Sequence, residues 1–457
     1  MPTRATNLAL APLAVWLVAL CVTPPPAWAQ SSPAQVPIAD LAYFPQDVSA
    51  YLDADAAATP LLSDDLQRKL FQQFRRRWFA PWQAQGPAIG EPALRSAMQK
   101  LLDAPSYGPN ARRRSAGWAG AMADLADLSH YPNALYAGIT VNAADLRELP
   151  TKEPSFEQFD QPGLGYPFDL LQASSLPPGT PLRVNHRSRD GAWLYCDTPL
   201  GSGWIDSTLV ATVNAEMARS WQGGPLAAIV RDDVSVQTGG VFRFRARIGA
   251  VFPLAGQGKE GPAIQIAIAD TDGAAVARTA QLAPGQAVPM PLPLTGANMA
   301  AIGDILLGQP YGWGGLCENR DCSSTLRDLF APFGLFLPRN SVDQAQIGLV
   351  IPLRHLPPER REQMILRKAR PLLTLIRIPG HIMLYVGPYK DQAAVLHTSW
   401  GVHTRLPGGG EGRHVVGCCA ITGLQPGKEV PNAILPGGDL RSRIESMIIL
   451  DETLLGP

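Results

Sequence analysis

The sequence predicts an α+β protein of several domains: a helical region near the N-terminus, two small β modules, and a last domain that mixes helix and strand. Three observations support this prediction. Apolar residues recur at helical spacing between about residues 40 and 135, and short strand-like runs with turns follow Pro150. From about residue 296, helical and strand patterns alternate. A length of 457 residues fits two to four such domains.

The overall composition narrows the class of protein. Lysine and arginine total 39, and aspartate and glutamate also total 39, so the chain has no net charge. This balance argues against a nucleic-acid-binding protein that neutralises many phosphates. Apolar residues make up 46% of the chain and charged residues 17%, which indicates a globular protein. The 43 glycines and 44 prolines favour short strands and loops over long helices.

Residues 1–29 have the features of an export signal. Arg4 precedes an apolar segment, 8–22, that is shorter than a typical membrane-spanning helix, and a small-x-small motif ends the segment. A lipoprotein site at Cys21 is a weaker interpretation, because Leu20 stands where a small residue is expected. We therefore expect a periplasmic or secreted protein. No later segment has 18 consecutive apolar residues, so we expect no stable membrane insertion.

Residues 30–150 are predicted to form a helical N-terminal domain. Ser63 can cap a helix, and apolar residues then recur every four positions: Leu66, Leu70, Phe74 and Trp78. Two further apolar stripes begin near Pro92 and Trp118.

The next two segments, 151–215 and 216–295, are predicted to be small β-barrels. The first contains short strands with turns at Gly179 and Asp190-Gly191. In the second, Thr271-Asp272-Gly273 separates two alternating runs and predicts a hairpin turn. Modules of roughly 60 to 70 residues fit small barrels.

The cysteines raise the question of a reactive thiol. Without the signal, five remain, an odd number that leaves at least one unpaired in an exported protein: Cys196, Cys317, Cys322, Cys418 and Cys419. Residues 321–331 are predicted to form a helix capped by Asp321. Cys322 then lies in its first turn, where the helix dipole favours a thiolate, the nucleophilic form.

Two histidines can supply the base that a nucleophile needs. We expect a hairpin centred on Tyr389, with His381 eight residues before this centre and His397 eight residues after it. The two side chains would then lie directly opposite each other, with Cβ atoms ~5 Å apart. One imidazole can take the thiol proton while the other orients it. The other histidines lack this spacing and are interpreted as structural: His130, His186, His355, His403 and His414.

Simpler interpretations exist for each residue taken alone. A cysteine at a helix start is usually structural, and Asp321 is an ordinary cap. Metal binding through Cys317 and Cys322 is a weak possibility, because no second ligand pair has zinc spacing. We therefore expect neither a metal nor a cofactor.

Five short motifs in the last domain occur in order: YGWGG before the cysteine, DCSS at it, RNSVDQ after the helix, GHIMLYVG at the first histidine and HTSWG at the second. On these motifs, residues 296–457 resemble the NlpC/P60 family of cell-wall cysteine peptidases. Upstream, LRELPT and the β-rich run that includes LLQASSLPPGTPLRV look like the helical segment and first bacterial SH3-like domain of one branch of that family. The resemblance implies a circularly permuted papain-like catalytic domain preceded by two SH3-like barrels.

The resemblance also implies an activity. Cys322 would be the nucleophile, His381 the base and His397 the orienting residue. The substrates would be peptidoglycan stem peptides or muropeptides, cut between γ-linked D-Glu and a diamino acid, often meso-diaminopimelate. Asp321 would bind the free amine of an N-terminal L-Ala with help from the first SH3-like domain. The positions matching other pocket residues are Tyr311, Ser323 and Ser341.

Several alternatives stay open. The chain could be an acyltransferase that uses the same thiol, a non-catalytic wall-binding protein, or a peptidase that acts on intact sacculi. A disulfide from Cys317 to Cys418 or Cys419 would stiffen the loop before the nucleophile. The diamino acid, the role of the second β module and the oligomeric state are not predicted.

Overall fold

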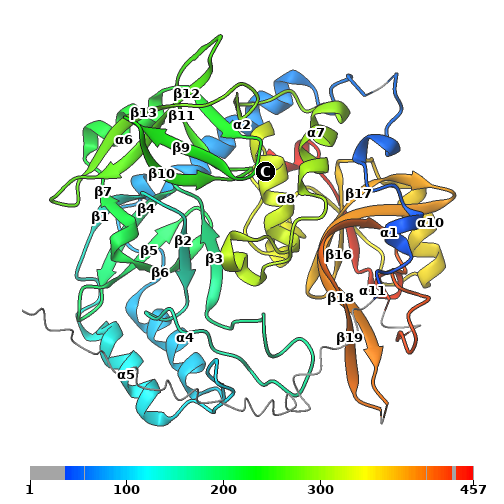
Figure 1. Ribbon diagram of the computed structural model, residues 1–457, viewed down its shortest axis with the longest axis horizontal. Helices are drawn as coiled ribbons and strands as arrows, with labels where there is room; N and C mark the ends of the chain where they lie inside the picture. The colour runs from blue at the N-terminus through cyan, green and yellow to red at the C-terminus, as the bar shows by residue number, and fades with distance from the viewer. Residues whose placement is uncertain (1–35, 56, 408, 435–438, 456–457) are drawn as a thin grey trace, which may run out of the picture. The chain divides into compact units, whose positions relative to one another are not determined.

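The computed structural model describes residues 36–55, 57–407, 409–434 and 439–455 (Figure 1). The predicted signal peptide, 1–29, lies outside these ranges. Residues 37–457 form one compact unit. Within the described ranges, no helix combines the length and the apolarity needed to cross a membrane.

The N-terminal region is helical, as its apolar stripes predict. Its helices are α1 (Asp40–Tyr43), α2 (Asp64–Trp78), α3 (Ala80–Gln83), α4 (Glu91–Asp103) and α5 (Ala116–Ala126), with 3-10 turns η2 (Val48–Tyr51) and η3 (Leu128–His130). Ser63 caps α2 by accepting a hydrogen bond from the Leu66 amide. The stripe of Leu70, Phe74 and Trp78 is buried. Capping and burial of one face therefore explain why this segment is a helix.

The first β module is a seven-stranded antiparallel sheet with strand order β3-β2-β6-β5-β4-β1-β7. Its strands are β1 (Tyr136–Thr140), β2 (Ala144–Arg147), β3 (Gln172–Leu176), β4 (Pro181–Arg187), β5 (Trp193–Thr198), β6 (Gly201–Asp206) and β7 (Val210–Thr212), with η4 (Ser207–Leu209) before the last. Strands β1 and β2 lie inside the range predicted as helical, 30–150. Both strands are short, and the glycine at position 138 weakens the strand pattern of β1. Glycine is needed there because a side chain would collide with Leu182.

The second β module follows α6 (Ala215–Gly223) and has two sheets, with strand orders β10-β9 and β13-β12-β11-β8-β14. The strands are β8 (Leu226–Ile229), β9 (Val234–Thr238), β10 (Val241–Ala246), β11 (Val251–Gly258), β12 (Gly261–Ala269), β13 (Ala275–Gln281) and β14 (Ala287–Pro289). Strands β12 and β13 form the hairpin predicted at Thr271-Asp272-Gly273.

The last domain is built on a six-stranded antiparallel sheet with strand order β15-β20-β16-β17-β18-β19. The strands are β15 (Leu349–Pro352), β16 (Thr374–Ile378), β17 (His381–Tyr389), β18 (Gln392–Arg405), β19 (Glu411–Thr422) and β20 (Ser446–Ile449). The helices are α7 (Gly296–Leu306), α8 (Cys322–Phe330), α9 (Ser341–Gln344), α10 (Pro358–Lys368) and α11 (Leu440–Arg443), with 3-10 turns η5 (Trp313–Glu318), η6 (Ala331–Phe333) and η7 (Glu452–Leu455).

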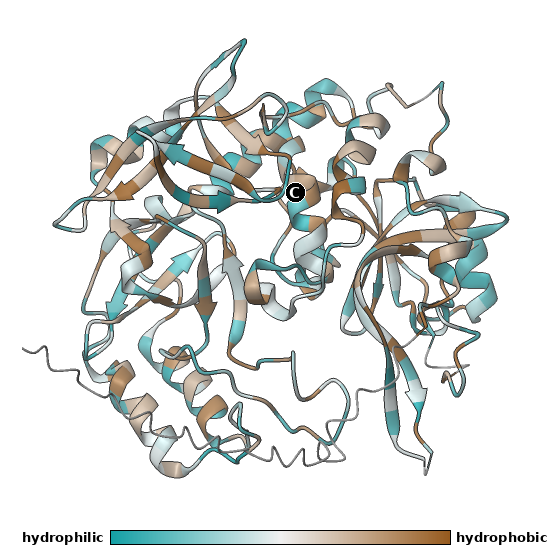
Figure 2. Ribbon diagram, viewed as in Figure 1, coloured by the Kyte–Doolittle hydropathy of each residue, from teal (hydrophilic) through white to brown (hydrophobic). Residues whose placement is uncertain are grey.

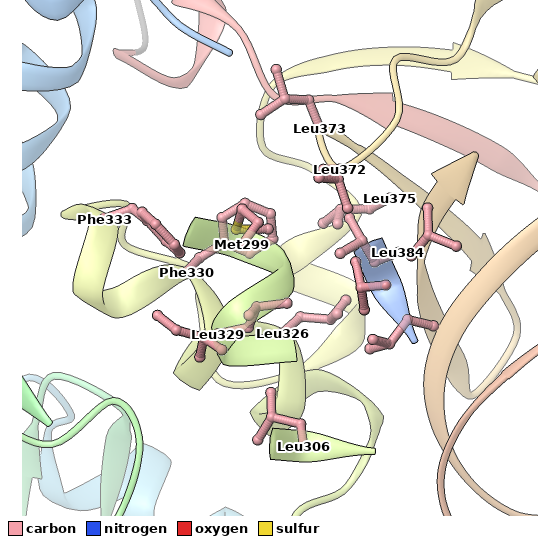
Figure 3. Close-up of a cluster of buried hydrophobic side chains, with 14 of the residues drawn as sticks. Met299, Leu306, Leu326, Leu329, Phe330, Phe333, Leu372, Leu373, Leu375 and Leu384 are labelled. Atoms are coloured by element: carbon pink, nitrogen blue, oxygen red, sulfur yellow. The ribbon is translucent and has the colours of Figure 1, made fainter. Parts of the chain in front are cut away.

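Two hydrophobic clusters hold this sheet between helices. On one side, Leu326 and Phe330 of α8 pack with Leu375 and Leu384 (Figure 3). On the other, Ile365 of α10 packs in a second buried cluster with residues of β16 and β17. Hydrophobic residues gather on the strands where they meet α8 (Figure 2). Burial of both faces fixes the position of α8, and hence of its first residue, against β17 and β18.

The glycine-rich turn in η5 joins the last domain to the first β module. Gly314 and Gly315 have φ angles of 61° and 86°. A Cβ atom would lie 2.3 Å from the Gln172 carbonyl oxygen at the first position and 2.6 Å from the Ser175 Cβ at the second. Glycine is therefore needed here both for the left-handed backbone and for the close approach to β3.

Candidate active site

A cleft of about 690 Å³ lies where the last domain meets the first β module. Its walls come from β17, β18, α8 and the segment 157–173 of the first module. The structure brings together in this cleft all seven residues that the sequence singles out: Tyr311, Asp321, Cys322, Ser323, Ser341, His381 and His397.

Cys322 is the first residue of α8. Asp321 caps the helix, as predicted: its Oδ1 accepts the Ser324 amide at 2.9 Å, while the Asp321 amide donates to Ser324 Oγ at 2.9 Å. This reciprocal capping box fixes where the helix begins. The sulfur therefore has a defined position, and the backbone amides of Ile382 and Ser323 donate toward it.

The protonation state of Cys322 differs from the expectation of a dipole-stabilised thiolate. Burial raises the pKa of the thiol to about 12, and the neighbouring Asp321 charge adds to this rise. The two backbone amides and Arg339 lower the pKa by less. Burial therefore opposes the thiolate that the helix dipole favours, and the thiol is the resting form of Cys322.

His381 and His397 are in contact, although not in the predicted register. The turn is at Lys390-Asp391, because Tyr389 pairs with Gln392, and a bulge between Tyr385 and Gly387 shifts the register again. Leu384 pairs with Leu396. Continuing this register by one residue places Met383 opposite His397, and His381 lies two residues beyond Met383. The predicted direct opposition is therefore wrong; the two histidines are diagonal neighbours, a distance that long side chains can span.

The imidazoles form a hydrogen-bonded chain that fixes their tautomers. His381 Nε2 lies 2.7 Å from His397 Nδ1, and His397 Nε2 lies 2.9 Å from Thr422 Oγ1. We assign the single proton of the Thr422 hydroxyl to the Gly423 carbonyl, 2.9 Å away, and on this assignment Thr422 accepts from His397 Nε2. His397 Nδ1 then accepts from His381 Nε2. His381 Nδ1 is left without a proton, as a base requires.

Both histidines are neutral near pH 7, as this tautomer assignment requires. Burial lowers the pKa of His397 to about 4. Burial also lowers the pKa of His381 well below its ordinary value, and His397, Arg443 and Arg377 lower it further. A neutral imidazole is the form that accepts a proton, so the cleft holds a protonated thiol and a free base at rest.

Asp321 has a partner in Arg339, the first residue of the RNSVDQ motif, to which the sequence assigned no role. Arg339 donates from Nη2 to Asp321 Oδ2 at 2.7 Å and from Nη1 to Oδ1 at 3.2 Å. Burial alone would raise the pKa of Asp321, but Arg339 and Ser324 outweigh it and hold the pKa at about 2. Asp321 is therefore a compensated anion before any ligand arrives.

The remaining predicted pocket residues lie around this pair. Ser323 Oγ donates to Asp321 Oδ1 at 3.1 Å, and Ser341 begins α9. The Tyr311 ring is 5.7 Å from the Trp400 ring and 6.3 Å from that of Phe168, which belongs to the first β module. One end of the cleft is thus an aromatic wall contributed by two domains.

Other charged residues in the cleft were also missed. Glu157 lines it from the first module, and Arg413 and Arg443 line it from the last domain. His403, interpreted as structural, lines it as well and pairs with Glu411 at 2.7 Å. No sequence motif marks these residues, because chain folding alone brings them together.

The five described cysteines are all free thiols. The disulfide suggested between Cys317 and Cys418 or Cys419 is therefore not formed. Cys317 is exposed, whereas Cys419 is buried. In the part of the chain that the structure describes, no group of three or more His, Cys, Asp or Glu side chains is arranged to hold a metal ion.

Four family models match the chain in order. They are the NLPC_P60 stabilising domain, N term, at residues 10–131; the SH3 domain of SH3b1 type at 154–206; the SH3 domain of SH3b2 type at 215–259; and the NlpC/P60 family at 308–406. No curated protein matches the sequence.

Among solved structures, one shows the same architecture over nearly its whole length. An NlpC/P60 endopeptidase from Photobacterium damselae subsp. piscicida matches 92% of this chain and 98% of its own, with 23% identity and a TM-score of 0.79. An NlpC/P60 family protein from Bacillus cereus matches 68% of this chain and 98% of its own, with 14% identity and a TM-score of 0.45. The predicted fold class is confirmed, and the chain belongs to the NlpC/P60 family, with a stabilising domain and two SH3 domains preceding the NlpC/P60 domain.

Proposed function

We propose that this protein is a cysteine endopeptidase that hydrolyses the bond between γ-D-Glu and the diamino acid of peptidoglycan stem peptides. The observation that carries the proposal is the chain of contacts from His381 through His397 to Thr422 in the cleft that holds Cys322. It leaves one unprotonated imidazole nitrogen available to the thiol. The predicted signal peptide supports action in the periplasm or outside the cell.

The reaction uses this base twice. His381 Nδ1 takes the proton of Cys322 as the sulfur attacks the γ-glutamyl carbonyl carbon. The Cys322 backbone amide, in the first turn of α8, is our candidate donor to the oxyanion. The C–N bond then breaks, and His381 gives the proton to the leaving amine. Water, deprotonated by His381, hydrolyses the thioester and returns the thiol.

A buried thiol is compatible with this chemistry. A free thiolate at rest would need charge stabilisation that burial opposes. Proton transfer to a neighbouring neutral imidazole creates the thiolate and the imidazolium together, and each then stabilises the other.

We further propose a preference for muropeptides with a free N-terminal L-Ala. Asp321 is already paired with Arg339, so its charge is partly neutralised. An ammonium group of the substrate therefore needs a second carboxylate. Glu157 lines the cleft from the first SH3 domain, and no described residue forms an ion pair with it. An ammonium in the cleft would gain this second carboxylate.

The cationic side of the cleft favours diaminopimelate over lysine as the leaving residue. Arg413 and Arg443 line it, and Arg443 donates to the Pro379 carbonyl close to His381. Diaminopimelate carries one carboxylate more than lysine. That carboxylate can pair with an arginine, whereas the lysine side chain offers no anion.

Mass spectrometry of defined peptides tests the proposal. We expect release of L-Ala-γ-D-Glu from L-Ala-γ-D-Glu-meso-diaminopimelate, slower cleavage of the N-acetylated peptide and of the lysine peptide, and no turnover by a folded Cys322→Ala variant. Equal activity in that variant would refute the assignment of the nucleophile.

Further arms of the same assay address the open alternatives. Transfer of the dipeptide to an added amine in preference to water would indicate an acyltransferase. Release of fragments from purified sacculi would indicate action on intact wall. Binding of sacculi without any product would indicate a wall-binding protein.

A further inference from the structure

The second SH3 domain contacts the segment that leads into the nucleophile. Arg320, two residues before Cys322, points away from the cleft into the second domain, where its Nη1 donates to Asp232 Oδ2 at 2.7 Å and its Nη2 to Asp232 Oδ1 at 2.8 Å. Asp232 lies in the loop between β8 and β9. This two-pronged pair fixes the guanidinium in direction as well as distance.

The pair is buried, so breaking it would destabilise the protein more than breaking a surface ion pair. The side chains of Arg320 and Asp232 are 4% and 5% exposed. Arg320 also donates to Asp328 of α8 at 2.7 Å and to the Ile248 carbonyl at 3.3 Å. Removing one partner from such a network leaves an uncompensated buried charge.

The main chain of Arg320 transmits this restraint to the cleft. Its carbonyl accepts the Gly312 amide at 2.9 Å, and Arg320 forms a backbone bridge with Tyr311. Asp321 and Cys322 follow directly in the chain. A shift of the guanidinium would therefore displace the aromatic wall, the capping aspartate and the nucleophile together.

A second loop of the same domain packs beside α8. Ile248 donates its amide to Asp232 at 2.9 Å, which ties this loop to the first one. Gly249 has a φ of 88°, and a Cβ there would lie 2.8 Å from the Asp328 Cα. Arg247 donates to the Glu318 carbonyl in the loop before the nucleophile. Two loops of the domain thus contact α8 and the segment that precedes it.

We propose that Asp232 is a positioning residue: through Arg320, the second SH3 domain sets the placement of Asp321 and Cys322. The proposal rests on the proposed function where turnover is the readout. It gives the second SH3 domain a role inside the catalytic unit, separate from any binding of cell wall.

The test compares three variants of the full chain. Asp232→Asn removes the charge and keeps the shape, Asp232→Glu keeps the charge, and Asp233→Asn changes the exposed neighbouring carboxylate. We expect Asp232→Asn to lower kcat at least tenfold with KM changed less than threefold, and to change the rate of Cys322 alkylation by iodoacetamide at least fivefold. Asp232→Glu should bring both kcat and the alkylation rate part of the way back to the wild-type values, and Asp233→Asn should match the wild type.

Two further variants separate positioning from stability. Ile266→Ala, on β12, creates a cavity in the core of the second SH3 domain and removes no group that bonds to Arg320. Arg320→Lys keeps a cation but loses the fork, and it serves if Asp232→Asn does not fold. We expect Ile266→Ala to lower the melting temperature without changing kcat, and Arg320→Lys to lower kcat as Asp232→Asn does.

Two results would show that Asp232 does not position Cys322. Wild-type kcat and alkylation in a folded Asp232→Asn protein would overturn the proposal, and so would an equal loss of kcat in Ile266→Ala. If the wild type cleaves none of the peptides, the proposed function fails, but the alkylation rates still test the role of Asp232.

Discussion

A few buried hydrogen bonds decide which nitrogen of each histidine carries a proton. Thr422 has one hydroxyl proton and gives it to the Gly423 carbonyl, so the assignment passes through His397 to His381. Sequence motifs identify Cys322 and both histidines, because their chemistry is carried by residue type. Thr422 escapes such reasoning, since a threonine in a strand is common everywhere. Arg339 opens the RNSVDQ motif, but the motif alone does not show that it pairs with Asp321.

The tautomer chain predicts a strong effect at Thr422. Thr422→Val keeps the shape but removes the acceptor, so His397 Nε2 loses its partner and the other tautomer competes. We expect kcat to fall roughly 10- to 100-fold with little change in KM, up to the lower end of the ~10²- to 10⁴-fold that general acid–base catalysis contributes. Thr422→Ser should stay near the wild type, and steady-state kinetics of both variants measures the difference. Equal losses in both would contradict a role for the hydroxyl.

The depressed pKa of His397 predicts an acid-labile fold. Its pKa is about 4 in the folded protein against 6.5 in the unfolded chain, so the unfolded state binds the proton first. Stability is therefore fully retained above pH 6.5 and is lost as the pH falls toward 4, by about 3 kcal/mol at roughly 1.4 kcal/mol per unit. Urea unfolding at several pH values should show this loss in the wild type and a smaller one in His397→Asn. Identical pH slopes in the two proteins would contradict it.

At the scale of elements, the sequence predicts which segments are strands better than how they pair. Residues on both sides of the turn after Tyr389 show a clear strand pattern, and β17 and β18 do form a hairpin. No sequence pattern marks the exact turn position or the bulge near Val386, so the pairing register cannot be predicted from the sequence. A bulge depends on packing across the sheet. The histidines still meet, since diagonal neighbours also lie within reach.

The turn at η5 allows a prediction about how two elements fit. Gly314→Ala would combine a left-handed backbone with a Cβ 2.3 Å from the Gln172 carbonyl oxygen. Gly308 has a similar φ of 77° but open space around it, so Gly308→Ala isolates the backbone cost. We expect Gly308→Ala to lower the free energy of unfolding by about 1 kcal/mol and Gly314→Ala by at least 2 kcal/mol more. Chemical denaturation compares them, and equal losses would mean that β3 can move away.

At the scale of the whole molecule, the cleft is shared between domains. The sequence predicts the domains in order, because each has its own periodicity and turns. The resemblance implies that the first SH3-like domain helps at Asp321, but it does not say which residues do so. Segment 157–173 lines the cleft, and contacts between domains depend on surfaces that no local pattern records. Phe168 shows this, because its ring contacts Trp313 at 5.3 Å and Trp400 at 6.0 Å across the domain boundary.

This shared wall predicts that the first SH3 domain contributes to substrate binding. Phe168 packs on the aromatic rings of Tyr311, Trp313 and Trp400 and is not a member of the hydrogen-bonded chain, so Phe168→Ala should raise KM roughly tenfold and change kcat little, as loss of uniform binding does. Phe159 lies on the same segment, is 41% exposed and packs on Phe156 instead, so Phe159→Ala is the matched control. Kinetics with the unblocked diaminopimelate peptide measures both variants. A fall in kcat with unchanged KM in Phe168→Ala would show that the SH3 domain orders the catalytic residues and does not hold the substrate.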